Sequence, residues 1–199
     1  MAFKKPSDYE SVTIGEYRIL PAGGYICRII KAEETKSKAG RDMLKIAFDI
    51  CDGGFSGYFM DQFQSRKAAA EDPKEVKWPF SGTKWVMIFD NEGGTNRDFK
   101  ALCTALKDSG TEVWDKNDNF LTGNLKDAEV GIIFRREEHE YMNQTSWRTV
   151  PFRFRSVKSI EAGDFNVPED KPMPSAYPGA GMAPMENDSF SALDDDIPF

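Results

Sequence analysis

Cysteine and histidine are scarce in this chain. Its 199 residues include three cysteines and one histidine. Cys27, Cys51 and Cys103 are widely spaced and form no Cys-x-x-Cys pair, so the sequence predicts neither a disulfide framework nor a thiolate zinc site. Free thiols are typical of a reducing compartment, and we therefore expect a cytoplasmic protein.

Long apolar runs are missing too. The N-terminal residues contain no apolar segment of the kind found in signal peptides. No stretch approaches the roughly 18 uncharged apolar residues that a membrane-spanning helix requires. We expect the protein to make no contact with a membrane.

The sequence also lacks a recognisable catalytic motif. It contains no Walker-type loop, no Gly-x-Ser-x-Gly elbow and no usable Cys/His pair. The lone His139 lies among glutamates in a predicted solvated loop and has no supporting ligand spacing. Asp72, Glu75 and Lys77 faintly resemble the acidic and Glu-x-Lys elements of metal-dependent nucleases, but all three share one polar connection. We therefore expect no enzyme, no metal and no cofactor, and keep a nuclease as a less favoured alternative.

The acidic charge is concentrated at one end of the chain. Of the net charge of −7, −6 belongs to residues 165–199, where seven acidic residues accompany Lys171 alone. Residues 1–164 therefore carry −1. The low pI of 4.9 describes the C-terminal segment and says little about the body, so a nucleic-acid partner is not excluded.

Composition changes after residue 164, where the chain becomes rich in Pro, Gly, Met, Ser and Ala. Such a segment buries too little apolar surface to offset its ordering entropy. Residues 165–193 are therefore predicted to be a disordered linker, with a reach of about 30 Å as a flexible coil. We expect one domain over residues 1–164, this linker, and a separate tip at residues 194–199.

Alternating and β-branched patterns predict five strands in the body. In the second of them, Leu44 and Ile46 alternate with Met43 and Lys45, which predicts a half-buried strand with Lys45 on its open face. Pro151 predicts an edge or a bulge in the last strand. The expected strands cover residues 24–35, 42–51, 83–90, 129–136 and 146–158.

One helix is expected within residues 95–109. Phe99, Leu102 and Leu106 follow helical spacing, Thr95 and Asp98 form a plausible capping box, and a short helix or hairpin is also possible near residues 58–70. Three strands, a helix and two strands is the order of an OB-fold, a five-stranded Greek-key barrel. We therefore expect a mainly β, OB-fold-like domain with its helix between strands three and four.

The last six residues, DDDIPF, are the most specific feature. They resemble the C-terminal tip of the bacterial single-stranded DNA-binding protein family, in which an acidic tip ending in Ile-Pro-Phe follows a Pro/Gly-rich linker. The body lacks that family's asparagine-containing first strand and its Gly-Arg motif, so the resemblance implies a divergent relative, such as a bacteriophage-encoded one in a bacterial cell. It implies partner docking by Asp194, Asp195, Asp196, Ile197, Pro198 and Phe199.

The chemistry of this tip supports the same role. A terminal phenylalanine offers a ring and a carboxylate to one pocket, and the three aspartates favour a basic rim. A solubilising tail is the alternative. That alternative does not explain why three apolar residues end the charged run.

Residues 147–155 suggest a surface for single-stranded DNA. Bases stack on aromatic rings, and cations follow the phosphates without reading sequence. An ordinary solvated strand face is the alternative. If Pro151 leaves the register unchanged, one face carries Trp147, Arg153 and Arg155 and the packed face carries Val150, Phe152 and Phe154.

Further candidate DNA contacts lie on the other predicted strands and turns. The expected function is sequence-independent binding and protection of single-stranded DNA in replication, recombination or repair, with the tip recruiting partner proteins. A strand-annealing mediator and an adaptor that uses the tip alone remain alternatives, and a homo-oligomer is possible. The additional candidates are Arg135, Arg136, Arg148, Lys36, Lys38, Arg41, Lys45 and Trp85.

Deletion of Phe199 tests the docking hypothesis. The deletion removes the apolar anchor and moves the terminal carboxylate onto Pro198, so partner capture should fall sharply, while affinity for oligo-dT and the melting temperature should stay the same. The measurement is a pull-down from nuclease-treated bacterial lysate with intact and deleted protein. Equal recovery of replication and repair proteins by both forms would contradict the docking role.

Overall fold

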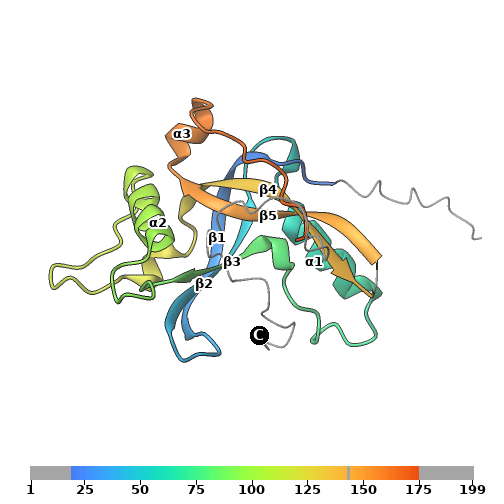
Figure 1. The fold of residues 1–199 in the computed structure, drawn as a ribbon, viewed down its shortest axis with the longest axis horizontal. Helices are drawn as coiled ribbons and strands as arrows, with labels where there is room; N and C mark the ends of the chain where they lie inside the picture. Colours follow the sequence, from blue (N-terminus) through green and yellow to red (C-terminus); the bar gives the residue numbers. More distant parts are fainter. Residues whose placement is uncertain (1–18, 143, 175–199) are drawn as a thin grey trace, which may run out of the picture.

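The computed structural model describes residues 19–142 and 144–174 (Figure 1). It is mainly β, with a five-stranded antiparallel sheet in the order β3-β2-β1-β4-β5. Among the described residues, no helix is long and apolar enough to cross a lipid bilayer. The strands are β1 (Gly23–Lys36), β2 (Asp42–Ile50), β3 (Thr83–Met87), β4 (Glu129–Tyr141) and β5 (Gln144–Arg155).

Three α-helices accompany the sheet. Helix α1 (Tyr58–Ala69) lies in the long connection between β2 and β3, and α2 (Arg97–Asp108) lies between β3 and β4. The short α3 (Val157–Glu161) follows β5. Helices α1 and α2 lie at opposite ends of the sheet (Figure 1). The sequence predicts α2, and at α1 it predicts either a short helix or a hairpin.

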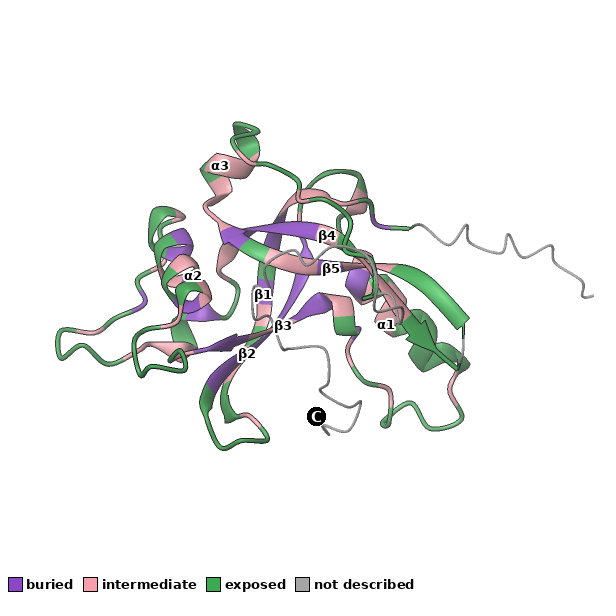
Figure 2. Cartoon of the chain, in the orientation of Figure 1, coloured by how far each residue is buried: buried purple, intermediate pink, exposed green. Residues whose placement is uncertain are grey.

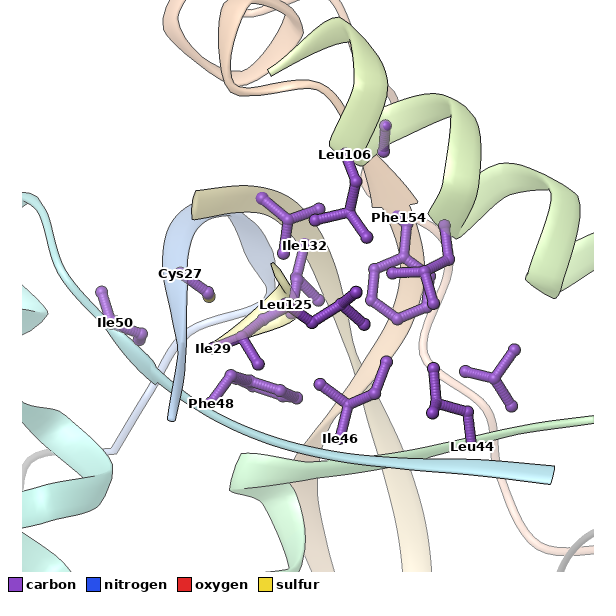
Figure 3. Close-up of a cluster of buried hydrophobic side chains, with 14 of the residues drawn as sticks. Cys27, Ile29, Leu44, Ile46, Phe48, Ile50, Leu106, Leu125, Ile132 and Phe154 are labelled. Atoms are coloured by element: carbon purple, nitrogen blue, oxygen red, sulfur yellow. The ribbon is translucent and has the colours of Figure 1, made fainter. Parts of the chain in front are cut away.

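The core is built on the inner face of β2. Leu44, Ile46, Phe48 and Ile50 are all buried there, as their alternation predicts. Figure 3 shows these side chains converging with residues from β1, β4 and β5 and from α2. The partners that complete the core include Ile29 of β1, Ile132 of β4, Phe154 of β5, and Leu102 and Leu106 of α2.

The outer face of β2 is buried as well. Met43, Lys45 and Ala47 are each less than 10% exposed, so the prediction that Lys45 lies on an open face is wrong. Alternation identifies which residues share a face, but it cannot show that a second face is also covered. Figure 2 shows burial concentrated in the sheet, with exposed residues in the loops and at the far end of the β4–β5 hairpin.

Helix α2 begins differently from its prediction. The helix cap is Asn96, whose side-chain oxygen accepts a hydrogen bond from the Asp98 amide at 2.8 Å, and the predicted capping box of Thr95 and Asp98 does not form the cap. Phe99 and Leu102 are buried as predicted. Asparagine and threonine are both good helix caps, so sequence alone places this start only to within a residue.

Helix α1 is capped by a carboxylate from the sheet. Asp49 accepts hydrogen bonds from the amides of Phe59 at 2.8 Å and Met60 at 3.2 Å, and from its neighbour Ile50 at 2.9 Å. Burial raises the pKa of Asp49, and these three hydrogen bonds oppose that rise. Phe59 then packs its ring on Phe134 of β4 in a stacked arrangement. Asp49 therefore joins the β2–β3 connection to the sheet.

The β4–β5 hairpin is longer than predicted. The charged residues 137–140, predicted as a loop, continue β4 until Tyr141 pairs with Gln144. A bulge lies at Phe152, because Ile133 pairs with Arg153 while the next residue, Phe134, pairs with Pro151. A bulge near Pro151 was one of the predicted possibilities.

This bulge separates residues that the sequence analysis grouped together. Trp147 pairs with Glu138, and Arg153 pairs with Ile133. Those partners are five positions apart on β4, so their side chains point to opposite faces. The prediction that Trp147 and Arg153 share a face holds only for an unchanged register, and the two residues do not share a face because the extra residue shifts the alternation between them.

The chain continues along the domain past residue 164, the predicted boundary. The Phe165 ring lies so close to Gly24 that a Cβ there would come within 2.6 Å of it. Lys171 then bonds β4 through both of its backbone groups, donating to Arg136 at 2.9 Å and accepting from Glu138 at 2.9 Å. These contacts place residues 165–174 with the domain, whereas residues 175–193 of the predicted linker and the 194–199 tip lie outside the described residues.

Asp49→Ala should destabilise the fold by about 1–3 kcal/mol, because it leaves the buried Phe59 amide and the partly buried Met60 amide without an acceptor. Urea unfolding measures the change. Asp52→Ala is the matched control, since Asp52 makes no side-chain capping bond, and it should stay within about 0.5 kcal/mol of the parent. Equal stability of the two variants would contradict the capping role of Asp49.

Candidate nucleic-acid interface

A lysine and a tryptophan lie opposite each other on the outer face of the sheet. Lys45 of β2 pairs directly with Trp85 of β3. Their sequence neighbours Leu44 and Val86 belong to the core, so Lys45 and Trp85 point to the other side. On β1, the residue in register with Lys45 is Glu33. The sequence names Lys45 and Trp85 separately, and the structure brings them together.

Charged groups surround Lys45. Burial lowers its pKa, the charge of Glu33 opposes that shift, and the charges of Lys31 and Lys77 add to it. Lys31 also forms an ion pair with Glu33 at 2.5 Å. Three lysines and one glutamate therefore lie near one another in this part of the structure.

Phe80 extends the aromatic surface from Trp85 towards β5. The Phe80 and Trp85 ring centroids are 5.4 Å apart, with planes tilted by 38°. The guanidinium carbon of Arg148, on β5, lies 4.5 Å from the Phe80 centroid. Trp85, Phe80 and Arg148 therefore form a continuous row from β3 to β5, which we call the stacking row.

A tight turn holds Phe80 in place. Phe80 opens the three-residue η2 turn (Phe80–Gly82) just before β3. The Trp78 indole donates to the Gly82 carbonyl at 3.0 Å, and a Cβ on Gly82 would come within 2.6 Å of that indole nitrogen. Only glycine allows this approach, so the turn depends on Gly82.

Two donors in the stacking row are buried without an acceptor. Within the described part of the chain, neither Trp85 Nε1 nor Arg148 Nε has a hydrogen-bond partner. Buried polar groups in folded proteins are nearly always paired. These two exceptions lie on either side of the same phenylalanine in the row, which marks this region as unusual.

The predicted basic turn between β1 and β2 is largely engaged within the protein. Lys36 forms an ion pair with Asp42 at 2.6 Å, and Arg41 donates to the Asn91 side chain. Lys38 is exposed. These groups lie at the end of the β1–β2 ribbon and remain candidate phosphate contacts.

One arginine of β4 and one of β5 lie against the Phe152 ring, and Arg155 lies further along β5. Arg153 and Arg135 place their guanidinium carbons 4.7 and 4.2 Å from the Phe152 ring centroid. Arg135 also pairs with Glu137 at 2.6 Å. Arg155 donates to the Phe154 carbonyl. Arg153 is the exposed member of this group.

Trp147 belongs to a different surface. It is 41% exposed, and Arg136 lies 5.1 Å from its ring. Arg136 also pairs with Asp170 at 3.2 Å. The predicted binding set is thus dispersed. The stacking row with Lys45 lies on one face, Trp147 with Arg136 lies on the other face of the hairpin, and the remaining candidates lie in the β1–β2 turn and around Phe152.

The residues considered for catalysis show no cation site. Among the described residues, no group of three or more His, Cys, Asp or Glu side chains is placed to hold a metal ion. The Asp72 carboxylate instead accepts a hydrogen bond from the Lys74 amide. Burial raises the pKa of Cys51 and of Cys103 to about 11, so both favour the thiol over the reactive thiolate.

Sequence reasoning missed Phe80, Lys31 and Lys77. Phe80 follows Trp78 and Pro79 directly, and an aromatic pair just before a predicted strand was a usable signal. Lys31 sits inside a predicted strand, and Lys77 in the polar connection. Nothing local marks either lysine as a neighbour of Lys45, because that proximity arises from strand pairing and from the path of the connection.

Residues 7–83 are similar to a family described as a protein of unknown function (DUF669). The match covers less than half of the chain and ends at Thr83, the first residue of β3. It therefore includes Lys45 and Phe80 but neither Trp85 nor Arg148. No curated protein shows significant similarity to the chain.

Lys45→Met should raise the melting temperature at pH 7. The lowered pKa of Lys45 means that folding disfavours the charged amine, so the native state gains stability as the pH rises from the folded pKa towards the unfolded value near 10.5. The difference in melting temperature between Lys45→Met and the parent protein should therefore shrink over that pH range. Thermal unfolding of both proteins between pH 7 and 10.5 measures it.

Lys31→Met is the control, because Lys31 is exposed and paired with Glu33. Its melting temperature should change little. A lower melting temperature for Lys45→Met at neutral pH would show that Lys45 stabilises the fold and would contradict this prediction.

Proposed function

We propose that this chain is a sequence-independent single-stranded DNA-binding protein, and that the outer face of β2 and β3 carries the binding surface. The observation on which the proposal depends is the Lys45–Trp85 pair with its attached stacking row. A base can stack on the indole while the exposed Lys31 attracts the phosphates. Duplex DNA hides its base faces, so this chemistry favours unpaired strands.

The sheet supports an OB-type barrel as the scaffold. Its order β3-β2-β1-β4-β5 places β3 and β5 at the two edges, where a five-stranded Greek-key barrel would close. Lys84 of β3 donates to the Phe152 carbonyl of β5 at 2.9 Å, and Arg148 of β5 lies over Phe80. In such barrels strands two and three commonly face the oligonucleotide, and here these are the strands that carry Lys45 and Trp85.

Two further features fit this function. Arg153 and the basic β1–β2 turn lie elsewhere on the sheet. They are placed to contact the phosphates of a DNA strand that continues beyond the stacking row. The DDDIPF tip would recruit replication, recombination or repair proteins to the bound strand. The tip lies outside the described residues, so its role rests on the sequence argument.

Binding of oligo-dT and of duplex DNA, compared over a salt series, tests the proposal. Oligo-dT should bind more tightly than duplex DNA. Its affinity should fall as the salt concentration rises, because binding releases cations from the phosphates. Trp85→Leu should weaken oligo-dT binding by about 1–3 kcal/mol, the contribution typical of one stacked base.

Trp114→Leu is the matched control. Trp114 is 39% exposed and packs with Phe99 and Phe120 beside α2, away from the stacking row, so its loss should leave affinity unchanged. Arg153→Ala should reduce the salt slope by about 0.7 if Arg153 contacts one phosphate. Equal affinity for duplex and single strand, or equal effects of the two tryptophan variants, would refute the proposed function.

A further inference from the structure

Phe80 occupies the position that a base would be expected to take. Its ring contacts both the Trp85 indole, 5.4 Å between centroids, and the Arg148 guanidinium, 4.5 Å from its own centroid. Indole rings and guanidinium planes are the groups on which unpaired bases stack. In the free protein, a flat aromatic side chain of the chain itself already uses these two groups.

The hydrogen bonding around Phe80 is incomplete. Trp85 Nε1 and Arg148 Nε are buried donors without partners in the described residues. A phenyl ring has no lone pair to offer them, whereas a nucleotide carries carbonyl oxygens, ring nitrogens and phosphate oxygens. The arrangement therefore provides the stacking surfaces of a base site with two donors beside it. The Phe80 ring uses the stacking surfaces but leaves the donors unpaired.

Phe80 is placed where its side chain can move without unfolding the sheet. It is 42% exposed and lies at the start of the three-residue η2 turn. The backbone of that turn is held from the other side by the Trp78–Gly82 hydrogen bond and by the Thr83 hydroxyl, which donates to the Pro79 carbonyl. A change of the Phe80 rotamer leaves both of these bonds intact.

We propose that Phe80 is a placeholder for one nucleobase. Its ring fills the slot beside Trp85 and Arg148 in the free protein, and it swings outward when a base of the single strand enters and stacks on Trp85, which lets other acceptors of the strand reach the two buried donors. The inference rests on the proposed single-strand binding. It differs from a platform role, in which Phe80 would add a stacking surface and its loss would weaken binding.

Phe80→Ala separates the two roles because they predict opposite signs. Emptying the slot removes the aromatic contact that a base must displace, so oligo-dT should bind about three- to tenfold more tightly. Association should also be faster, because the Phe80 ring no longer has to leave the slot before a base can enter. Fluorescence anisotropy gives the affinity, and stopped-flow tryptophan fluorescence gives the association rate.

Two more variants keep the test independent of folding effects. Phe80→Leu retains an apolar side chain on the turn and loses the ring contacts, so it should give a smaller gain. Phe89→Ala truncates another exposed phenylalanine, 49% exposed beyond the end of β3, and should give no gain. A tighter complex in the Phe89 variant would mean that the effect is not specific to the slot.

A double-mutant cycle with Trp85→Leu completes the test. Once Trp85 is gone the slot has lost its stacking surface, so Phe80→Ala should no longer raise affinity. If Phe80→Ala binds oligo-dT as well as the parent or more weakly, while binding still depends on Trp85, the placeholder role is contradicted. The proposed function is then unaffected. Failure of the parent protein to bind oligo-dT would overturn both.

Discussion

Strand β2 is buried along both of its faces, and the other parts of the structure are arranged around that constraint. Its inner residues, such as Ile46 and Phe48, form the centre of the core. On the outer face, Lys45 meets Trp85, and Asp49 caps α1. Because alternate residues of one strand serve the core, the candidate site and the helix cap, a one-residue shift in register would disrupt all three.

Patterns that arise within one element could be predicted from the sequence. The positions of the five strands and of α2 follow from alternation and from the spacing of Phe99, Leu102 and Leu106. The charged end of β4 could not be predicted, because residues 137–140 look like a loop and become a strand through pairing with β5. The same pairing contains the bulge that separates Trp147 from Arg153.

The candidate site shows the same limit. Lys45, Trp85 and Arg148 are all recognisable as candidates, yet their association depends on β2–β3 pairing and on the approach of β5 to the η2 turn. Phe80 gives little signal by itself, and its importance comes from its two neighbours. Residue types can therefore be assigned to nucleic-acid chemistry from sequence, while their grouping on one face requires the strand register and the approach of β5 to the η2 turn.

The distribution of polar groups over the two faces of the sheet argues for a ligand. The inner face of β2 is apolar, whereas the outer side of the sheet holds two buried donors without acceptors among the described residues, one on β3 and one on β5. Each unpaired donor destabilises the free fold, and apolar substitutes would avoid that cost. The phosphates and base edges of an unpaired strand carry acceptors for such donors, so a single ligand can offset both costs.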